Sequence, residues 1–190
     1  MEEKISINHK FDLASLAKQL TGLTILQLIY KGLLKSNDPI GKYFPELKPA
    51  LQKVTVRQLA NHTNGIHDFY TLTDKHDSLT NQKILTMLSQ LDSTVFTPGT
   101  KWGYSNSGYV LLSLLIERVT KTSYQNYCSK NILSPLGMTS YCFAPTTDTV
   151  LTGYTSKMEP EKIRPFTSGA SGLYASGTDI IAYYKAVSKD

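Results

Sequence analysis

The chain has 190 residues, of which 41% are hydrophobic and 18% are charged. This composition is typical of a globular protein, and the length is sufficient for a hydrophobic core, so we expect residues 1–190 to form one domain. Its formal net charge of +5 is spread along the chain, and the sequence lacks the basic stripe with interleaved aromatic residues that marks a nucleic-acid-binding protein. The longest apolar run is too short and too interrupted to predict a membrane span.

The N-terminal part of the chain predicts a short strand followed by a buried helix. Residues 4–10 alternate loosely between polar and apolar side chains, as a strand does. Between Lys18 and Lys31 the chain carries no charge, and its Leu and Ile side chains cover most of a helical circumference. We therefore expect the helix over residues 14–31 to be the most buried element. Gly32 is expected to end it with a positive φ.

Ser15 and Lys18 stand three positions apart at the start of this helix, which places both side chains on one face. A serine oxygen at the positive end of a helix can bear developing negative charge, and a lysine with a lowered pKa can accept its proton. Roughly one such spacing is expected by chance, so Ser15 could instead only start the helix while Lys18 reaches solvent. A lysine at the head of an otherwise uncharged core helix favours the first interpretation.

Capping motifs and periodicity predict the remaining helices. They run from Val56 to the turn at 62–65, from Thr80 to Leu91, from Gly108 to Thr120, from the Thr122-Gln125 capping box to the turn before Pro135, and from Ile180 to Val187. Residues 141–168 predict a loop with at most one short strand, and the glycine-rich turn at 168–172 indicates tight packing. We therefore expect a helix-rich, strand-poor chain.

Cysteine and histidine spacing predicts neither a metal nor a cofactor. Cys128 and Cys142 can pair or remain separate core residues, because two cysteines alone do not define a disulfide framework. The four histidines show no metal-ligand spacing, and His62 and His67 are interpreted as hydrogen-bonded structural residues.

Several motifs follow one another in a fixed order from Phe11 onward. They are Phe11-x-x-Ala14-Ser15-Leu16-Ala17-Lys18, residues 54–59, residues 62–66, Pro98-Gly99, residues 104–109, residues 135–138 and residues 171–179. This series resembles the serine β-lactamase and penicillin-binding-protein superfamily, in particular the branch of class C β-lactamases, D-Ala-D-Ala carboxypeptidases and related esterases.

The resemblance implies an α+β fold of the β-lactamase/transpeptidase type and a serine hydrolase that forms an acyl-enzyme on Ser15. The implied catalytic residues are Ser15, Lys18 and Tyr104, with Asn106 binding the substrate, which is a β-lactam, a D-amino-acid peptide or an ester. No cofactor is implied. The resemblance suggests an exported or cell-envelope protein, although the acidic start Met1-Glu2-Glu3 predicts no signal peptide within these residues.

Tyr104 and Asn106 also make chemical sense beside Ser15. A loop between a proline turn and a helix can direct a phenol and an amide into one cleft. Tyr104 would take the serine proton or return it to the leaving group, and the nearby cation of Lys18 would favour its phenolate. Residues 124–126 repeat the Tyr-x-Asn form but lie inside a capped helix, where they are interpreted as packing.

The family's third motif, Lys-Thr-Gly or His-x-Gly on a strand, has no counterpart in this sequence, because Lys121-Thr122-Ser123 joins two helices. We expect the helical part of the domain with most of its antiparallel sheet missing, at both ends of the chain. The absent strand would supply the second oxyanion-hole amide, and losing one such donor costs about 10²–10³ in rate.

Three alternatives therefore remain open: a hydrolase, an inactive or impaired relic or binding module, and an unrelated helical protein. An incomplete sheet also predicts an exposed apolar surface and self-association.

Overall fold

The structure is a computed structural model that describes residues 4–74, 79–143, 150–160 and 167–188. Its strands are β1 (Lys10–Asp12), β2 (Tyr141–Cys142) and β3 (Tyr174–Ser176). Its α-helices are α1 (Ala17–Tyr30), α2 (Pro49–Gln52), α3 (Val56–Ala60), α4 (Asn81–Leu88), α5 (Asn106–Thr120), α6 (Tyr124–Cys128) and α7 (Gly177–Val187). Single turns of 3₁₀ helix occur at Ala14–Leu16, Ile40–Lys42 and Phe69–Thr71, and a π-helical segment, Ser129–Leu133, continues α6.

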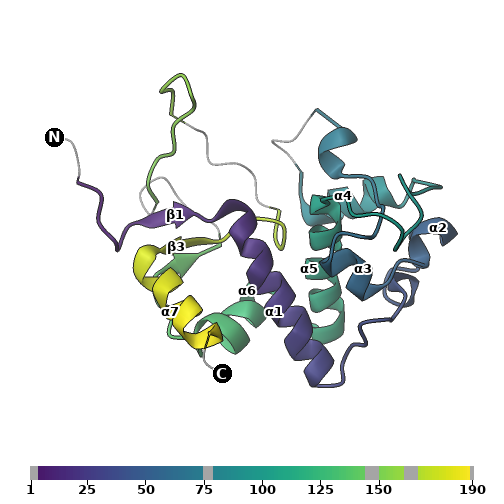
Figure 1. Cartoon of the computed structure of the whole chain (residues 1–190), viewed down its shortest axis with the longest axis horizontal. Coiled ribbons are helices and arrows are strands. Elements are labelled where there is room, and N and C mark those ends of the chain that lie inside the picture. The colour runs from purple at the N-terminus through teal and green to yellow at the C-terminus, as the bar shows by residue number, and fades with distance from the viewer. Residues whose placement is uncertain (1–3, 75–78, 144–149, 161–166, 189–190) are drawn as a thin grey trace.

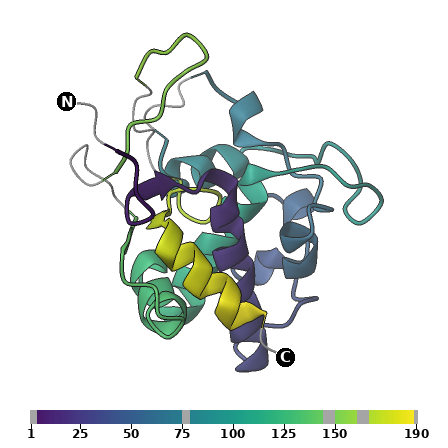
Figure 2. The ribbon, with the colours of Figure 1, turned by 60° about the vertical axis from the view of Figure 1, so that its left-hand side comes forward.

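Helix α1 runs through the middle of the molecule, between two groups of elements (Figure 1). The small sheet, α6 and α7 lie on one side of it, and α2 to α5 lie on the other. Figure 2 shows α7 lying beside α1, where the side chains of Gln19 and Tyr184 are hydrogen-bonded. Because both groups meet at α1, its first turn lies close to segments from the middle and the end of the chain.

The three strands form one antiparallel sheet in the order β1-β3-β2. Phe11 of β1 pairs with Ala175, and Leu13 N donates to Leu173 O at 3.0 Å just beyond the strand. The sheet thereby holds the chain immediately before α1. Sequence periodicity placed this strand too early, at residues 4–10, because it could not show that Ser6 and His9 close a turn through two hydrogen bonds.

The described part of residues 141–168 is mostly irregular, as the weak periodicity of this segment predicted. Strand β2 is the short strand expected there, and residues 150–160 stand away from the body as a loop closed by a bridge between Tyr154 and Pro160 (Figures 1 and 2). Residues 144–149 and 161–166 of the same predicted loop lie outside the described residues.

Helix α5, and not α1, is the most buried helix, and all three residues of strand β3 are buried as well. Ten of the fifteen residues of α5 are buried, against seven of the fourteen residues of α1. Leu20 and Leu112 are buried as expected, but Leu16 is 52% exposed and Leu26 is 63% exposed. The reason is packing: α5 contacts α1, α3, α4 and α6, whereas one stripe of α1 has no element packed over it in the described part of the chain.

Most of the predicted helix caps are confirmed. Thr55 forms a complete capping box with Gln58, and Thr80 caps α4, although that helix ends at Leu88, before the predicted Leu91. The cap of α6 is Ser123 and not Thr122. The Gln125 side chain donates to Ser168 Oγ instead of returning to the cap, because this long-range partner lies beside it.

Cys128 and Cys142 do not form a disulfide with each other: Cys128 is buried and Cys142 is half-buried. Burial raises the pKa of the Cys128 thiol to about 11, so it behaves as a small core residue.

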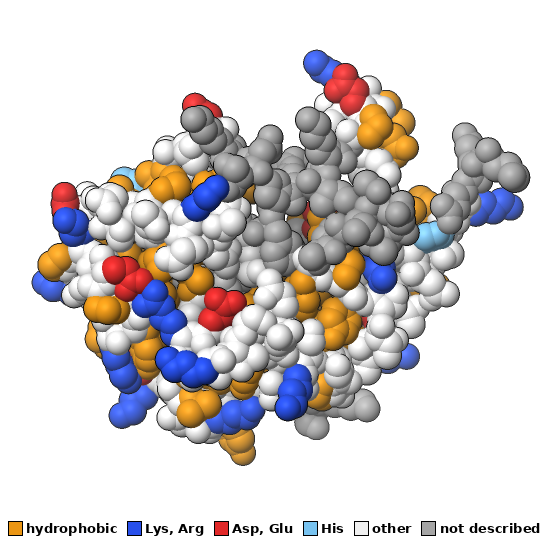
Figure 3. All heavy atoms as spheres, turned by 180° about the vertical axis from the view of Figure 1, so that it is seen from behind, with side chains coloured by type: hydrophobic (Ala, Val, Ile, Leu, Met, Phe, Trp, Pro, Cys, Tyr) orange, Lys and Arg blue, Asp and Glu red, His pale blue; other side chains and the backbone are white. Residues whose placement is uncertain are grey.

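Positive charge is not concentrated in a stripe on the face shown in Figure 3, where lysine and arginine side chains are scattered among polar and hydrophobic ones. In the part of the chain that the structure describes, every helix is too short or too polar to span a membrane.

Candidate active site

Ser15 lies in a 3₁₀ turn in front of α1 and not within the α-helix itself, which begins at Ala17. The residue before it, Ala14, has a φ of +43°, a left-handed conformation that costs energy for any residue with a Cβ. Asp12 Oδ1 stabilises this turn by accepting a hydrogen bond from Ala14 N at 2.8 Å. The strained turn leads the chain from β1 into α1 and leaves the Ser15 side chain exposed.

Lys18 is buried, with 6% of its surface exposed, so it does not reach solvent. Its Nζ donates to Ser15 Oγ at 3.2 Å, to Asn106 Oδ1 at 2.9 Å and to Ala170 O at 2.7 Å. Burial lowers the pKa of Lys18, while the neighbouring Tyr104 hydroxyl and the charge of Asp68 act in the opposite direction. A lysine held in this way has a neutral form that is more accessible than that of a surface lysine.

Tyr104 completes the contacts of the serine. Its hydroxyl donates to Ser15 Oγ at 2.7 Å, and Lys18 Nζ lies 4.9 Å from the centre of its ring. The ring stacks on His62, with 4.6 Å between the ring centres. His62 Nδ1 accepts from Ser105 N at 3.1 Å, so His62 is hydrogen-bonded as predicted and also supports the loop that carries Tyr104.

Asn106 is the first residue of α5, which begins two residues earlier than the predicted Gly108 because Ser105 caps it. The amide of Asn106 is held at both ends. Its Oδ1 accepts from Lys18 Nζ at 2.9 Å, and its Nδ2 donates to Asp68 Oδ2 at 3.2 Å. The structure thus brings Ser15, Lys18, Tyr104 and Asn106 together in one cluster.

Two members of the cluster could not be found from the sequence. Asp68 belongs to no motif, and its contact with Asn106 spans 38 residues. Ala170 contributes a backbone carbonyl, which carries no side-chain signal at all. The turn that presents this carbonyl is tightly packed, as the glycine pattern of residues 168–172 predicted: a Cβ added to Gly169 would lie 2.5 Å from Tyr109 O.

The cluster contains no evident metal site. In the described ranges, His, Cys, Asp and Glu side chains do not gather in any group of three or more that could hold a metal ion. Lys121-Thr122-Ser123 connects α5 to α6 and does not lie on a strand, as the sequence predicted.

Acid is expected to destabilise the fold through His62. Burial and, next, the charge of Lys18 lower the pKa of His62, and Asp68 opposes them in part. An unfolded histidine, with a pKa of about 6.5, therefore takes up its proton first as the pH falls. The unfolded state then binds more protons than the folded state. The free energy of unfolding therefore decreases as the pH falls from about 6.5 through the lower pKa of His62 in the folded protein.

Urea unfolding at several pH values between 5 and 8 measures this effect. The pH dependence should weaken in His62→Gln and persist in His67→Gln, a matched change five residues along the chain. Equal slopes in His62→Gln and in the unsubstituted chain would contradict the assignment.

Comparison with known proteins places the whole chain in one family. The family model described as Beta-lactamase matches residues 2–190. Penicillin-binding protein 4* of Bacillus subtilis (strain 168) is 35% identical over 176 residues, which cover 89% of this chain and 36% of that protein. The chain thus spans about a third of the length of the curated relatives it matches, since the corresponding share of protein flp from Staphylococcus aureus is 30%.

Solved structures agree on the fold. A D-amino acid amidase from Ochrobactrum anthropi SV3 has a TM-score of 0.83 at 27% identity, over 96% of this chain and 57% of that one. A β-lactamase/D-alanine carboxypeptidase from Pseudomonas syringae has a TM-score of 0.81 at 22% identity, over 97% of this chain and 52% of that one. The helix-rich α+β architecture with its small sheet is therefore a β-lactamase/transpeptidase-like fold, as the motif order predicted. The chain belongs to the beta-lactamase family, within the serine β-lactamase and penicillin-binding-protein superfamily.

Proposed function

We propose that this chain carries the nucleophile and the proton-transfer groups of a serine hydrolase that acts through an acyl-enzyme on Ser15. Members of this family are serine hydrolases. The observation that carries the proposal is the contact of Ser15 Oγ with two proton-transfer groups, Lys18 Nζ at 3.2 Å and the Tyr104 hydroxyl at 2.7 Å. Hydrogen-bond reach between nucleophile and base is the geometric requirement for this chemistry.

In the proposed reaction, Ser15 Oγ attacks the substrate carbonyl carbon, and its proton passes to Lys18 or Tyr104, whichever is deprotonated. The carbonyl electron pair moves onto oxygen, with the Ser15 backbone N–H as one oxyanion donor. Collapse of this intermediate breaks the bond to the leaving group, which takes the proton back. Asn106 retains a second amide hydrogen on Nδ2, which can donate to the substrate.

The proposed substrate is a β-lactam, a D-amino-acid peptide or an ester. All three present a carbonyl to the serine, and they differ in the group that leaves. The names of the structural neighbours include a D-amino acid amidase and a β-lactamase/D-alanine carboxypeptidase, which supports this range without choosing within it.

Covalent labelling tests the proposal. The purified chain is incubated with a fluorophosphonate or a fluorescent penicillin, and the labelled peptide is identified by mass spectrometry. We expect the added mass on Ser15, with slow labelling by the penicillin. A label on an exposed serine such as Ser93 but not on Ser15 would overturn the nucleophile assignment.

A second candidate function is a binding module that keeps this cluster without turning over substrate. It is favoured by the lack of a Lys-Thr-Gly or His-x-Gly strand motif in the sequence. Such a module would bind peptidoglycan-like or acyl ligands and would not be labelled on Ser15, so the same experiment separates the two.

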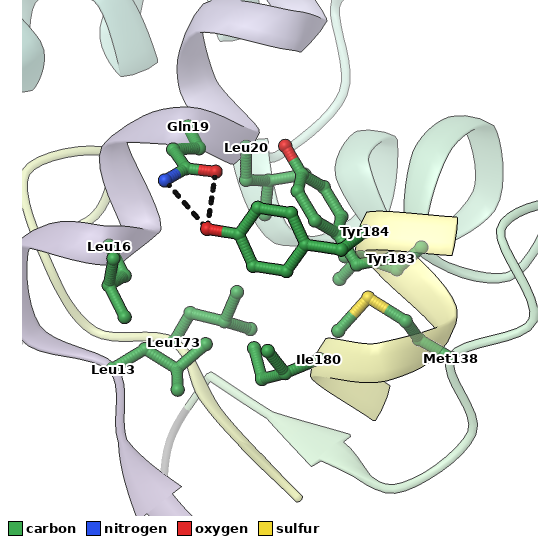
Figure 4. Close-up of a pocket in the computed structure, with 10 residues that line it drawn as sticks. Leu13, Leu16, Gln19, Leu20, Met138, Leu173, Ile180, Tyr183 and Tyr184 are labelled. Carbon is green, nitrogen blue, oxygen red and sulfur yellow. Dashed lines mark hydrogen bonds between the residues drawn. The ribbon is translucent and has the colours of Figure 1, made fainter. Parts of the chain in front are cut away.

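We further propose that residues 1–190 form one β-lactamase-like domain whose sheet is completed by further strands. The support is the exposure of apolar side chains on α1 and the 3₁₀ turn before it, where Leu16, Leu26 and Tyr30 are 52%, 63% and 92% exposed. Figure 4 shows a small apolar pocket between α1 and α7, where Ile180 and Tyr184 of α7 face Gln19 of α1 and Leu16 of the preceding 3₁₀ turn. Its volume is about 30 Å³.

An uncovered apolar surface of this kind favours association with a second copy or with strands from elsewhere. We expect the isolated 190-residue chain to be oligomeric or marginally stable. Light scattering after gel filtration measures this directly. The double change Leu26→Lys and Tyr30→Lys should shift the mass of an oligomer toward that of a monomer. A monodisperse monomer that also melts cooperatively, before any substitution, would contradict the proposal.

A further inference from the structure

We propose that Asp68 is a positioning residue of this site: its carboxylate fixes the orientation of the Asn106 amide and, through it, the place of the Lys18 ammonium group beside Ser15. The inference rests on the proposed function only in taking Ser15 as the nucleophile. Asp68 belongs to no motif of the sequence, and it touches neither Ser15 nor Tyr104 through a hydrogen bond that would make it a direct participant.

The geometry joins Asp68 to Asn106 twice. Asp68 Oδ2 accepts from Asn106 N at 2.6 Å and from Asn106 Nδ2 at 3.2 Å. The next residue strengthens the connection, because Phe69 N donates to Ser107 Oγ at 2.8 Å. Hydrogen bonds to an ionised acceptor are stronger than neutral ones, and a carboxylate at the first N–H of a helix also interacts favourably with its dipole.

The carboxylate selects one of the two possible orientations of the amide. An asparagine side chain has nearly the same shape when its oxygen and nitrogen are exchanged. In the observed orientation, Oδ1 of Asn106 faces the donor Lys18 Nζ and Nδ2 faces the acceptor Asp68 Oδ2. The exchanged orientation would place two donors together at Lys18 and two acceptors together at Asp68. Both contacts would then be repulsive.

Charge gives the second part of the argument. Lys18 is buried, and the ionisable groups facing it are Tyr104, Tyr109, His62 and Asp68. Asp68 is the carboxylate in this set, and its charge raises the pKa of Lys18 against the effect of burial. Asp68 therefore acts on Lys18 both through the Asn106 amide and directly through space.

A purely structural role is the competing explanation, because Asp68 also caps a turn. Its Oδ1 accepts from Tyr70 N at 3.1 Å, in front of the 3₁₀ turn at Phe69–Thr71. Loss of this cap would lower stability without changing how Lys18 titrates. The titration of Lys18 is therefore the measurement that separates positioning from capping.

The experiment compares Asp68→Asn, Asp68→Ala and the unsubstituted chain. Asp38→Asn is the matched control, since Asp38 also accepts a backbone N–H but lies outside the cluster. The titration midpoint of Lys18 is followed by ¹³C NMR of its ε-carbon, assigned with Lys18→Met. The side-chain amide signals of Asn106 and the rate of fluorophosphonate labelling are recorded on the same samples.

We expect both Asp68 substitutions to lower the titration midpoint of Lys18. Asp68→Ala should also shift the Asn106 amide signals and slow labelling by about 10²-fold, the scale of a displaced catalytic group. Asp68→Asn retains an oxygen that can accept from Asn106, so its labelling should fall less. Asp38→Asn should leave the Lys18 midpoint unchanged.

An unchanged Lys18 midpoint in folded Asp68→Asn would overturn the inference, even if the variant were less stable. If Asp68→Ala fails to fold by circular dichroism, the Asp68→Asn titration still decides. Failure of the unsubstituted chain to label on Ser15 would count against the proposed function instead, because the NMR titration needs no reaction.

Discussion

Replacing Lys18 with methionine is expected to slow acylation of Ser15 by about 10²–10⁴-fold, the usual contribution of a positioned acid–base group. The substitution removes the only nitrogen that joins Ser15 Oγ, Asn106 Oδ1 and Ala170 O within the described structure. Methionine is close to the aliphatic part of lysine in length, so it fills the buried space that the Lys18 side chain occupies. The measurement is the rate of fluorophosphonate labelling, relative to the unsubstituted chain under the same conditions.

Stability is expected to change far less than reactivity in Lys18→Met. Removing a buried ammonium group relieves its desolvation, while the unpaired Ala170 carbonyl costs about 1–3 kcal/mol, so the two effects oppose each other. Lys31→Met is the control, because Lys31 is exposed and ends the same helix. Labelling of Lys18→Met at the unsubstituted rate would show that Lys18 takes no part in the chemistry.

The local features of this chain could be predicted from its sequence. Capping boxes depend on residues three positions apart, and the box at Thr55 that starts α3 occurs as predicted. Helix α7 was expected from Ile180, but it begins at Gly177, because Ser176 and Asp179 form a capping box there. Gly32 has a φ of +72° directly after the helix end that it was expected to terminate. The spacing of Ser15 and Lys18 is equally local, and it places their side chains within hydrogen-bond reach even though the serine lies in a 3₁₀ turn.

The features that could not be predicted from the sequence depend on contacts between distant parts of the chain. The exposure of Leu26 is decided by what packs over α1, which its own apolar pattern cannot show. Asp68 is joined to Asn106 across 38 residues, and Ala170 to Lys18 across 152. Contacts of this kind follow from the packing of α1, α5 and the turn at 168–172, so they can be read only from the fold. The roles of Ser15, Lys18, Tyr104 and Asn106 stay predictions until they are measured.

Replacing Gly169 with alanine is expected to give the largest loss of stability among single substitutions considered for this chain. Gly169 has a φ of +89°, and a Cβ there would lie 2.5 Å from Tyr109 O and 2.6 Å from Ser113 Cβ. Both neighbours belong to the buried helix α5 and cannot move freely. Strain in the left-handed region together with overpacking predicts a loss of about 2–5 kcal/mol in the free energy of unfolding.

The same substitution should reach the candidate site, because Thr21 Oγ1 donates to Gly169 O at 2.9 Å and Lys18 Nζ donates to the following carbonyl, Ala170 O. A backbone that moves away from α5 carries both acceptors with it. Labelling of Ser15 should therefore slow even at temperatures where Gly169→Ala remains folded, and thermal melting and labelling should be recorded together.

Gly22→Ala is the matched control for this glycine. Gly22 lies inside α1, and an added Cβ there meets no atom within 4 Å. Alanine is favoured over glycine in a helix interior by about 1 kcal/mol, so this change should raise the free energy of unfolding. It also supplies a stabilised background in which Gly169→Ala can be measured if the single variant is too unstable. Equal unfolding free energies for the two variants would show that the close approach of residues 168–172 to α5 does not limit the fold.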